Sequence, residues 1–318
     1  MQKIYHILKS HIQEDFNPMY YGCVLLFLAI SITLNYGLRI HSLLWDLSYG
    51  DHSYWAIAAS FLFFALPFFF CVGLYSYLYK DTSFWYKEEF WVKTVVLLLV
   101  RALIMGAWHH ILPVYAYNRD SADYFWLFRT LMVGRVYVYE GLALVLLYFL
   151  YEKEKNHFWG FTFKGFDWKP YAYLLGIMAV GVCIACFMGN AFVGYYPIMR
   201  PTRLEGLTLM NPKVGFWVFE AFYASFYSWT EIFFRGLMVI GFSRLLGRHA
   251  ILPMVAVYVF LHFQKPIGET IGAIVAGYTL GVLAFRTRSV MGGVLVHAGV
   301  SFMMEMFPIL LGIVAWFK

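Results

Sequence analysis

Charged side chains are scarce in this sequence. Asp, Glu, Lys and Arg together supply 13% of its 318 residues, roughly half of their share in an ordinary soluble domain. Hydrophobic residues supply 62% and aromatic residues 21%, so a soluble fold would expose large apolar patches and aggregate. A water-soluble protein is therefore excluded, and the many Trp and Tyr residues suit the two membrane–water interfaces.

Cysteine and concentrated charge are also lacking. Cys183 and Cys186 form a CxxC pair inside an apolar run, but no second Cys or His pair stands at the spacing of a zinc site. We therefore interpret them as small packing residues. The adjacent His109 and His110 point in different directions on a helix, which argues against a joint role. The net charge of +6 is spread thinly, so we predict no nucleic-acid partner.

Long apolar runs dominate what is present. A spanning helix needs about 20 mainly apolar residues, because lipid cannot satisfy backbone polar groups. Such runs fall at residues 19–38, 54–79, 92–112, 131–151, 171–194, 214–242, 250–263, 267–285 and 289–316. The last run contains Pro308, where a helix can break. The sequence therefore predicts an all-α fold, a polytopic transmembrane helical bundle with eight or nine spans.

Lys and Arg are divided unequally between the two sides that these spans define. The segments on the side of the N-terminus hold the larger share, most clearly in the basic and aromatic loop at residues 152–170. By the positive-inside rule, this excess predicts an integral membrane protein with a cytoplasmic N-terminus. We find no internal repeat, no low-complexity tract and no soluble domain of any size.

Ionisable residues inside the apolar runs are informative, because each is costly in lipid and by default suggests function. Lys93 and Arg101 lie near enough to an interface for us to expect that they snorkel toward water. Arg135 and Glu140 stand close together in the fourth run, and we interpret them as a structural ion pair. None of these four residues by itself indicates a site.

The sixth to ninth runs carry a denser polar set. It comprises Glu220, Glu231, Arg235, His262, His297, Ser301 and Glu305. Glu231 and Arg235 are four residues apart, so on a helix they share a face in the favourable order for an ion pair. Each histidine alone would more often be a satisfied core residue. Together, on helices joined by short turns, these side chains are hard to explain as packing and predict a functional site.

Three short motifs occur in order along this region. They are Thr230-Glu231-Ile-Phe-Phe-Arg235, then Tyr258-x-x-x-His262, then His297-x-x-x-Ser301. They resemble the E-E-x-x-x-R, F-x-x-x-H and H-x-x-x-N motifs of the CAAX-prenyl-protease-like and bacteriocin-processing (CPBP, Abi) intramembrane proteases. The resemblance covers roughly residues 170–310. It implies N-terminal transmembrane helices at residues 1–169 and a protease-like domain at residues 170–318.

The resemblance implies an intramembrane endopeptidase in which a Glu and a His activate the water that attacks the scissile carbonyl. Carried over, the base is His262 and the oxyanion is stabilised by His297, while Glu231 and Arg235 hold the site in register. Such a reaction needs a proton acceptor and donors aimed at the developing negative charge. The implied substrate is a peptide or prenylated-type protein, in the lipid bilayer of a bacterial cell membrane. No cofactor is expected, although a metal at His262, His297 and Glu231 is compatible with the residue types.

Two positions depart from the family motifs. Thr230 stands in place of the first Glu, and a hydroxyl can orient a water but cannot take its proton at neutral pH. Losing a general base lowers the rate by about 10²–10⁴. Ser301 stands in place of Asn and keeps a donor on a shorter side chain. Glu220 or Glu305 would have to supply the missing carboxylate from other turns of the same helices.

Two functions from different classes therefore stay open. One is an endopeptidase whose activity is weakened at Thr230 and Ser301. The other is a non-catalytic member that binds a peptide, a lipid or a membrane partner in an immunity-type role. A transporter is less favoured, because the sequence has no visible inverted repeat. For a hydrolase we expect Glu231, Arg235, His262 and His297 to converge on one cavity, with Ser301 on its wall.

Overall fold

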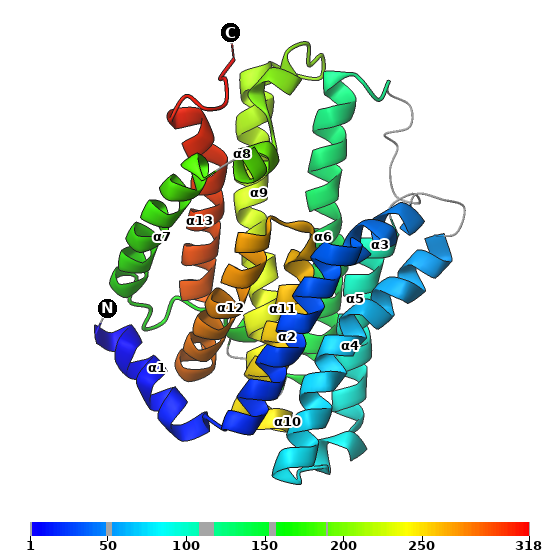
Figure 1. Ribbon diagram of the computed structural model, residues 1–318, viewed down its shortest axis with the longest axis vertical. Coiled ribbons are helices and arrows are strands. Elements are labelled where there is room, and N and C mark those ends of the chain that lie inside the picture. Colours follow the sequence, from blue (N-terminus) through cyan, green and yellow to red (C-terminus); the bar gives the residue numbers. More distant parts are fainter. Residues whose placement is uncertain (1, 49–52, 108–117, 153–156, 189, 318) are drawn as a thin grey trace. The chain divides into compact units, whose positions relative to one another are not determined.

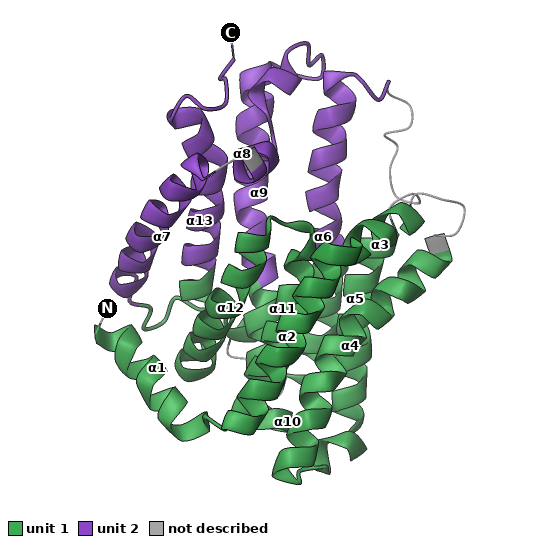
Figure 2. Cartoon of the chain, in the orientation of Figure 1, with its two compact units in different colours: residues 1–110, 139–166, 231–293 green, residues 111–138, 167–230, 294–318 purple. Residues whose placement is uncertain are grey.

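A computed structural model describes residues 2–48, 53–107, 118–152, 157–188 and 190–317. Every regular element in these ranges is a helix, so the all-α prediction is confirmed. Contacts divide the chain into two compact units, coloured in Figure 2. Unit 1 comprises residues 1–110, 139–166 and 231–293, and unit 2 comprises residues 111–138, 167–230 and 294–318. His109 and His110 lie outside the described residues. The division at 169/170 concerns family resemblance and stays a prediction.

Seven helical stretches of the described chain are long and apolar enough to cross a bilayer. They are Pro18–Leu38, Tyr54–Tyr79, Ala122–Tyr151, Lys169–Phe187, Pro212–Gln264, Ile267–Thr287 and Met291–Leu310. One of them contains both expected runs 214–242 and 250–263. The expected run 92–112 corresponds to α5 (Glu88–Gly106), whose charged residues keep it out of the seven. The count approximates the eight or nine expected and identifies an integral membrane protein.

Unit 1 is built around α11 (Ile251–Leu261). Its other elements are α1 (Gln2–Asp15), α2 (Pro18–Leu38), α3 (Ile40–Ser48), α4 (Ser53–Tyr79), η1 (Ser83–Tyr86), α5, the end of α6 (Ala122–Tyr151), η3 (Phe158–Gly160), η5 (Ile232–Gly241), α10 (Ser243–Leu246), η6 (Gly247–Ala250), η7 (His262–Gln264) and α12 (Ile267–Thr287). Every residue from Ile251 to Phe260 is buried, and α11 packs against α2, α4, α12 and η5 (Figure 1). A helix that is apolar on all sides is buried by protein. The length of α11 therefore does not have to match the thickness of a bilayer.

The N-terminal helix α1 is docked on unit 1 by its polar residues. Arg286 Nη2 donates to Glu14 Oε2 at 2.7 Å, and Tyr21 donates to Asp15 Oδ2 at 2.6 Å. The hydrogen bond from Arg286 lowers the pKa of Glu14. His11 is fully buried beside them, and burial lowers the pKa of its imidazole below the ordinary 6.5. The amphipathic start of the chain is thus a packed element outside the spans.

Unit 2 holds two aromatic-rich clusters. Its elements are the first part of α6, α7 (Lys169–Phe187), α8 (Asn190–Tyr195), η4 (Pro201–Leu204), most of α9 (Pro212–Glu231) and most of α13 (Met291–Leu310). Asp123 of α6 accepts the Thr208 amide at 2.8 Å and its hydroxyl at 2.7 Å, which holds the α8–α9 connection. Helix α13 passes Pro308 and ends two residues later at Leu310. The helix is therefore continuous at Pro308, and the break expected at that residue does not occur there.

Candidate functional site

Glu231 and Arg235 form the ion pair that their spacing predicts. Arg235 Nη1 donates to Glu231 Oε1 at 2.9 Å, and both side chains are fully buried. The same guanidinium lies over the ring of Tyr258 in α11, 4.2 Å from its centroid. An ion pair buried in this way keeps both charges compensated, and its loss would leave one charge stranded. The pair therefore fixes the beginning of η5 against α11.

The segment that begins directly after Glu231 and carries Arg235 is a π-helix, Ile232–Gly241, where the sequence predicted a continuous α-helix. Its last turn closes on the fifth residue, with the Phe242 amide donating to Leu237 O at 3.1 Å. In an α-helix, Gly236 and Gly241 would point about 140° apart. Here both face Trp159: a Cβ added at Gly236 would lie 2.6 Å from Trp159 O, and one at Gly241 would lie 2.5 Å from its indole. π-Turns occur frequently at functional sites.

Trp159 is held in this position by the bundle itself. Its indole Nε1 donates to Leu144 O at 2.9 Å, and the side chain is 1% exposed. The next residue, Gly160, has a positive φ of 80° and accepts the Val290 amide at 3.0 Å. A residue with a side chain is disfavoured at that φ. Trp159 and Gly160 thus form a wedge: they pack between η5 and the end of α12. Sequence reasoning missed this role.

The interpretation of Lys93 and Arg101 as snorkelling residues is wrong, since both are buried. Lys93 Nζ lies 2.5 Å from Glu89 Oε1 and donates to Gly241 O at 2.9 Å. Arg101 Nη1 lies 2.5 Å from Glu140 Oε1. The structure thus pairs Glu140 with Arg101, whereas the sequence suggested Arg135. Carboxylates within the bundle compensate these cations, so neither side chain has to reach water.

The imidazole of His262 has a defined tautomer. Its Nδ1 lies 2.8 Å from Tyr258 O, and because a carbonyl oxygen only accepts, Nδ1 must carry the proton. The lone pair of the neutral ring is therefore on Nε2. The ring also packs on the Tyr258 ring, with centroids 4.4 Å apart. Tyr258 thus links the Glu231–Arg235 pair to His262 within unit 1.

The turn that carries His262 is held by hydrogen bonds from two neighbouring helices. Thr270 of α12 donates to His262 O at 2.7 Å, and its hydroxyl lies 2.7 Å from that of Tyr36 in α2. Tyr36 also donates to Lys265 O at 2.6 Å, and Asn35 donates to Phe263 O at 3.0 Å. These positioning residues were missed by the sequence reading. The one signal in the sequence that could have indicated them was Asn35, an amide side chain inside an apolar run.

Gly293 at the start of α13 lies against the same ion pair. A Cβ added there would overlap Glu231 Oε2, so only glycine leaves room for the carboxylate. Gly293 stands one turn before His297 on the same helix. Gly293, one turn before the third motif, is therefore the residue at which α13 contacts Glu231 of the first motif.

In unit 2, the remaining motif residues lie on α9 and α13. Thr230 is 3% exposed, and its hydroxyl donates to Phe226 O at 3.4 Å. The His297 ring packs on Tyr227, with centroids 4.4 Å apart, and Tyr227 donates to the Tyr223 hydroxyl. Ser301 is buried one turn after His297. His297 and Ser301 lie on one helix, four residues apart, so the expectation that they share a face of α13 is confirmed.

The two spare carboxylates, Glu220 and Glu305, are both buried in unit 2. Glu305 Oε2 accepts the Ile198 amide at 2.8 Å. This hydrogen bond ties α13 to the segment after α8. Sequence reasoning identified Glu305 but missed its backbone partner, although an isolated carboxyl group in an apolar run requires one.

The predicted site residues are divided between the two units. Glu231, Arg235 and His262 belong to unit 1, whereas Thr230, His297 and Ser301 belong to unit 2. Their convergence on one cavity stays a prediction. Within the described ranges, no three His, Cys, Asp or Glu side chains are grouped as metal ligands. The expectation that no cofactor takes part also stays a prediction.

Comparison with known families bears on the region that carries the three motifs. Residues 211–303 match the model of the type II CAAX prenyl endopeptidase Rce1-like family. The family resemblance is confirmed. The matched region includes every motif position from Thr230 to Ser301. No curated protein and no solved structure matches the chain.

Proposed function

We propose that the protein is an intramembrane endopeptidase that hydrolyses a peptide bond in a peptide or prenylated-type protein. The observation that carries this proposal is the hydrogen bond from His262 Nδ1 to Tyr258 O. With the proton on Nδ1, the lone pair on Nε2 is the acceptor that a general base needs. Peptide hydrolysis by an activated water depends on such an acceptor.

The other motif residues act around this base. Arg235, ion-paired with Glu231 and stacked on Tyr258, positions the helix segment beside His262 rather than taking part in proton transfer. His297 and Ser301 donate hydrogen bonds to the oxyanion that forms when water adds to the carbonyl. Thr230 orients the water. The proton that His262 takes from water then passes to the leaving amine, which completes the hydrolysis.

We expect this activity to be weak. The family's first Glu is Thr230 here, and the absence of that carboxylate lowers the rate by about 10²–10⁴. Glu305 accepts the Ile198 amide, which argues against its recruitment as the missing base. His262 is left as the proton acceptor.

The same observation on Thr230 favours a second candidate function. Its hydroxyl is buried and directed to the Phe226 carbonyl, so position 230 contributes no carboxylate to the site. A non-catalytic member would keep the fold to bind a peptide, a lipid or a membrane partner in an immunity-type role. We place the protein in a bacterial cell membrane with its N-terminus in the cytoplasm, on the basis of the Lys and Arg excess on that side.

Cleavage of a prenylated CAAX-type peptide by the purified protein tests both candidates. We expect slow cleavage by wild type, a rise in Thr230→Glu, and a loss of about 10²–10⁴ in His262→Ala. His6→Ala, an exposed histidine of α1, is the matched control. Robust wild-type activity that is indifferent to His262 would contradict the base assignment. Activity that appears only in Thr230→Glu would establish the non-catalytic reading for the natural sequence.

A further inference from the structure

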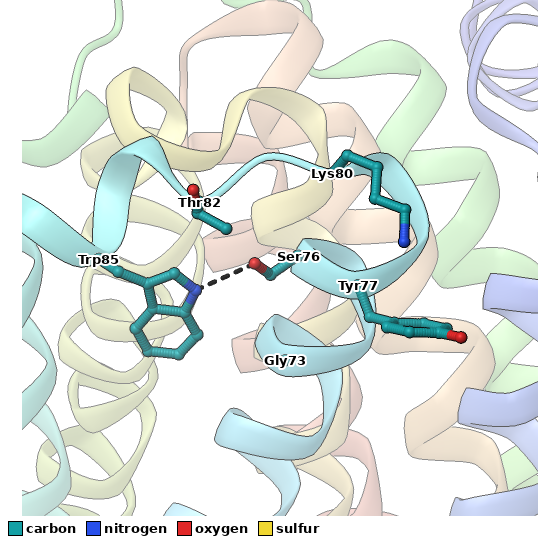
Figure 3. Close-up of a pocket in the computed structure, with 6 residues that line it drawn as sticks. All are labelled: Gly73, Ser76, Tyr77, Lys80, Thr82 and Trp85. Carbon is teal, nitrogen blue, oxygen red and sulfur yellow. Dashed lines mark hydrogen bonds between the residues drawn. The ribbon is translucent and has the colours of Figure 1, made fainter.

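An open hollow of about 410 Å³ lies in unit 1, where α4 ends and η1 begins. Figure 3 shows its lining: Gly73, Ser76, Tyr77, Lys80, Thr82 and Trp85. None of the residues of the three motifs lines it. Because α4 is one of the seven spanning helices and the span ends at Tyr79, the hollow lies at a membrane–water interface.

The deeper part of the hollow is apolar and preformed. Ser76 donates to Asp81 O at 2.8 Å and accepts the Trp85 indole N–H at 3.0 Å, which fixes the indole as one wall. Tyr77, which is 68% exposed, forms the opposite side. A Cβ added at Gly73 would meet no atom within 4 Å. The floor at Gly73 is therefore an open depression in the surface of a spanning helix.

The outer end of the hollow is cationic. Lys80 has a left-handed φ of 57°, and its Nζ lies over the Tyr77 ring, 4.5 Å from the centroid. Lys80 forms no ion pair with any described carboxylate, and the Thr82 hydroxyl makes no capping hydrogen bond. The nearby Asp81 accepts hydrogen bonds from Ser83 and Tyr75. Two donors are thus left at the rim, one of them charged.

We propose that this hollow binds an anionic phospholipid, with its phosphate at Lys80 and Thr82 and the start of an acyl chain over Gly73. The seven residues from Gly73 to Tyr79 span about 9 Å of helix at 1.5 Å per residue, and Lys80 follows directly. That length takes the groove from headgroup depth into the first methylenes of a lipid tail. Tyr77 and Trp85 are the amphipathic rings that such depths favour. A free phosphate would use the rim but leave the apolar floor empty.

Native mass spectrometry of the purified protein with phosphatidylglycerol and with phosphatidylcholine of the same acyl chains tests this site. We expect phosphatidylglycerol to bind more tightly, and Lys80→Ala to weaken it about fivefold, the equivalent of about 1 kcal/mol for one basic residue near an anionic surface. Lys87→Ala is the matched control, because Lys87 is exposed at the end of the same turn and does not line the hollow. Gly73→Phe should fill the floor and abolish the preference, with unchanged thermal unfolding as the check on folding.

Any of four outcomes would overturn the proposal. The first is equal binding of the two lipids by wild type. The second is equal effects of Lys80→Ala and Lys87→Ala, which would indicate general surface charge. The third is displacement of phosphatidylglycerol by an equal concentration of inorganic phosphate. The fourth is binding that is unaffected by Gly73→Phe. Either of these two would indicate an anion site without a place for the acyl chain. None of these readouts requires peptidase activity, so the result is independent of the function proposed above.

Discussion

Gly293 of α13 lies so close to Glu231 that a methyl group at position 293 would overlap the Glu231 carboxylate. We predict that Gly293→Ala displaces this carboxylate from Arg235 and destabilises the protein by about 1–3 kcal/mol, the usual range for overpacking a buried site. Thermal unfolding in detergent measures the change. Gly272→Ala on α12 is the control, because a Cβ there meets no atom within 4 Å. Equal stability of the two variants would show that Glu231 has room to move.

Breaking the Glu231–Arg235 pair should be more damaging than overpacking it. Arg235→Ala or Glu231→Ala each leaves one buried charge uncompensated, with an expected loss of about 3–5 kcal/mol. The double variant removes both charges, so we expect it to be more stable than the sum of the single losses predicts. Additive losses in this double-mutant cycle would contradict a direct ion pair.

The wedge at Trp159 gives a third prediction. Trp159→Ala removes the indole packed on Gly236 and Gly241 and should lower the free energy of unfolding by about 3–5 kcal/mol. Trp159→Phe keeps most of the packing but loses the hydrogen bond to Leu144 O, so its loss should be about 1 kcal/mol. If the two variants unfold at the same temperature, the indole does not support η5 by packing.

Variants of Glu305 distinguish a role as the missing general base from a structural role. In the wild type, the Ile198 amide donates to Glu305 at 2.8 Å. Glu305→Gln keeps an oxygen that can accept this hydrogen bond, so we expect peptide cleavage to persist. Glu305→Ala leaves that amide without its acceptor and should destabilise the protein by about 1–3 kcal/mol. Loss of cleavage in a stably folded Glu305→Gln variant would instead make Glu305 the missing base.

The docking of α1 should depend on pH. Burial lowers the pKa of His11 below the ordinary 6.5, so the undocked helix takes up a proton first as the pH falls. The contribution of neutral His11 is full above pH 6.5 and declines as the pH drops from there toward the lowered folded value. We expect limited proteolysis at Lys9 to accelerate between pH 7 and pH 5. A His11→Phe variant should lose this dependence, and a wild-type rate independent of pH would contradict it.

The sequence predicted the local part of this molecule well. The spacing of Glu231 and Arg235 required only a helical turn, and the structure confirms their ion pair. The register of His297 and Ser301 on α13 follows from the same rule. Continuous apolar runs located the spanning helices, because lipid restricts the backbone to few alternatives.

The contacts that depend on distant segments could not be read in this way. The glycines of the π-helix face Trp159, which lies far from Gly236 along the chain, and Glu140 pairs with Arg101 on another helix. The tautomer of His262 depends on where the Tyr258 carbonyl points. Periodicity reports the face on which a residue lies, but not which other segment faces it.

The π-helix at Ile232–Gly241 makes the number of residues in this segment important for its packing. Because its turns close on the fifth residue rather than the fourth, the segment accommodates more backbone than an α-helix of the same rise. A single-residue deletion there can be absorbed by converting the segment to an α-helix, with the flanking helices intact. The two glycines would then no longer face Trp159 together, so the packing on this indole depends on the length of the segment as much as on its residue types.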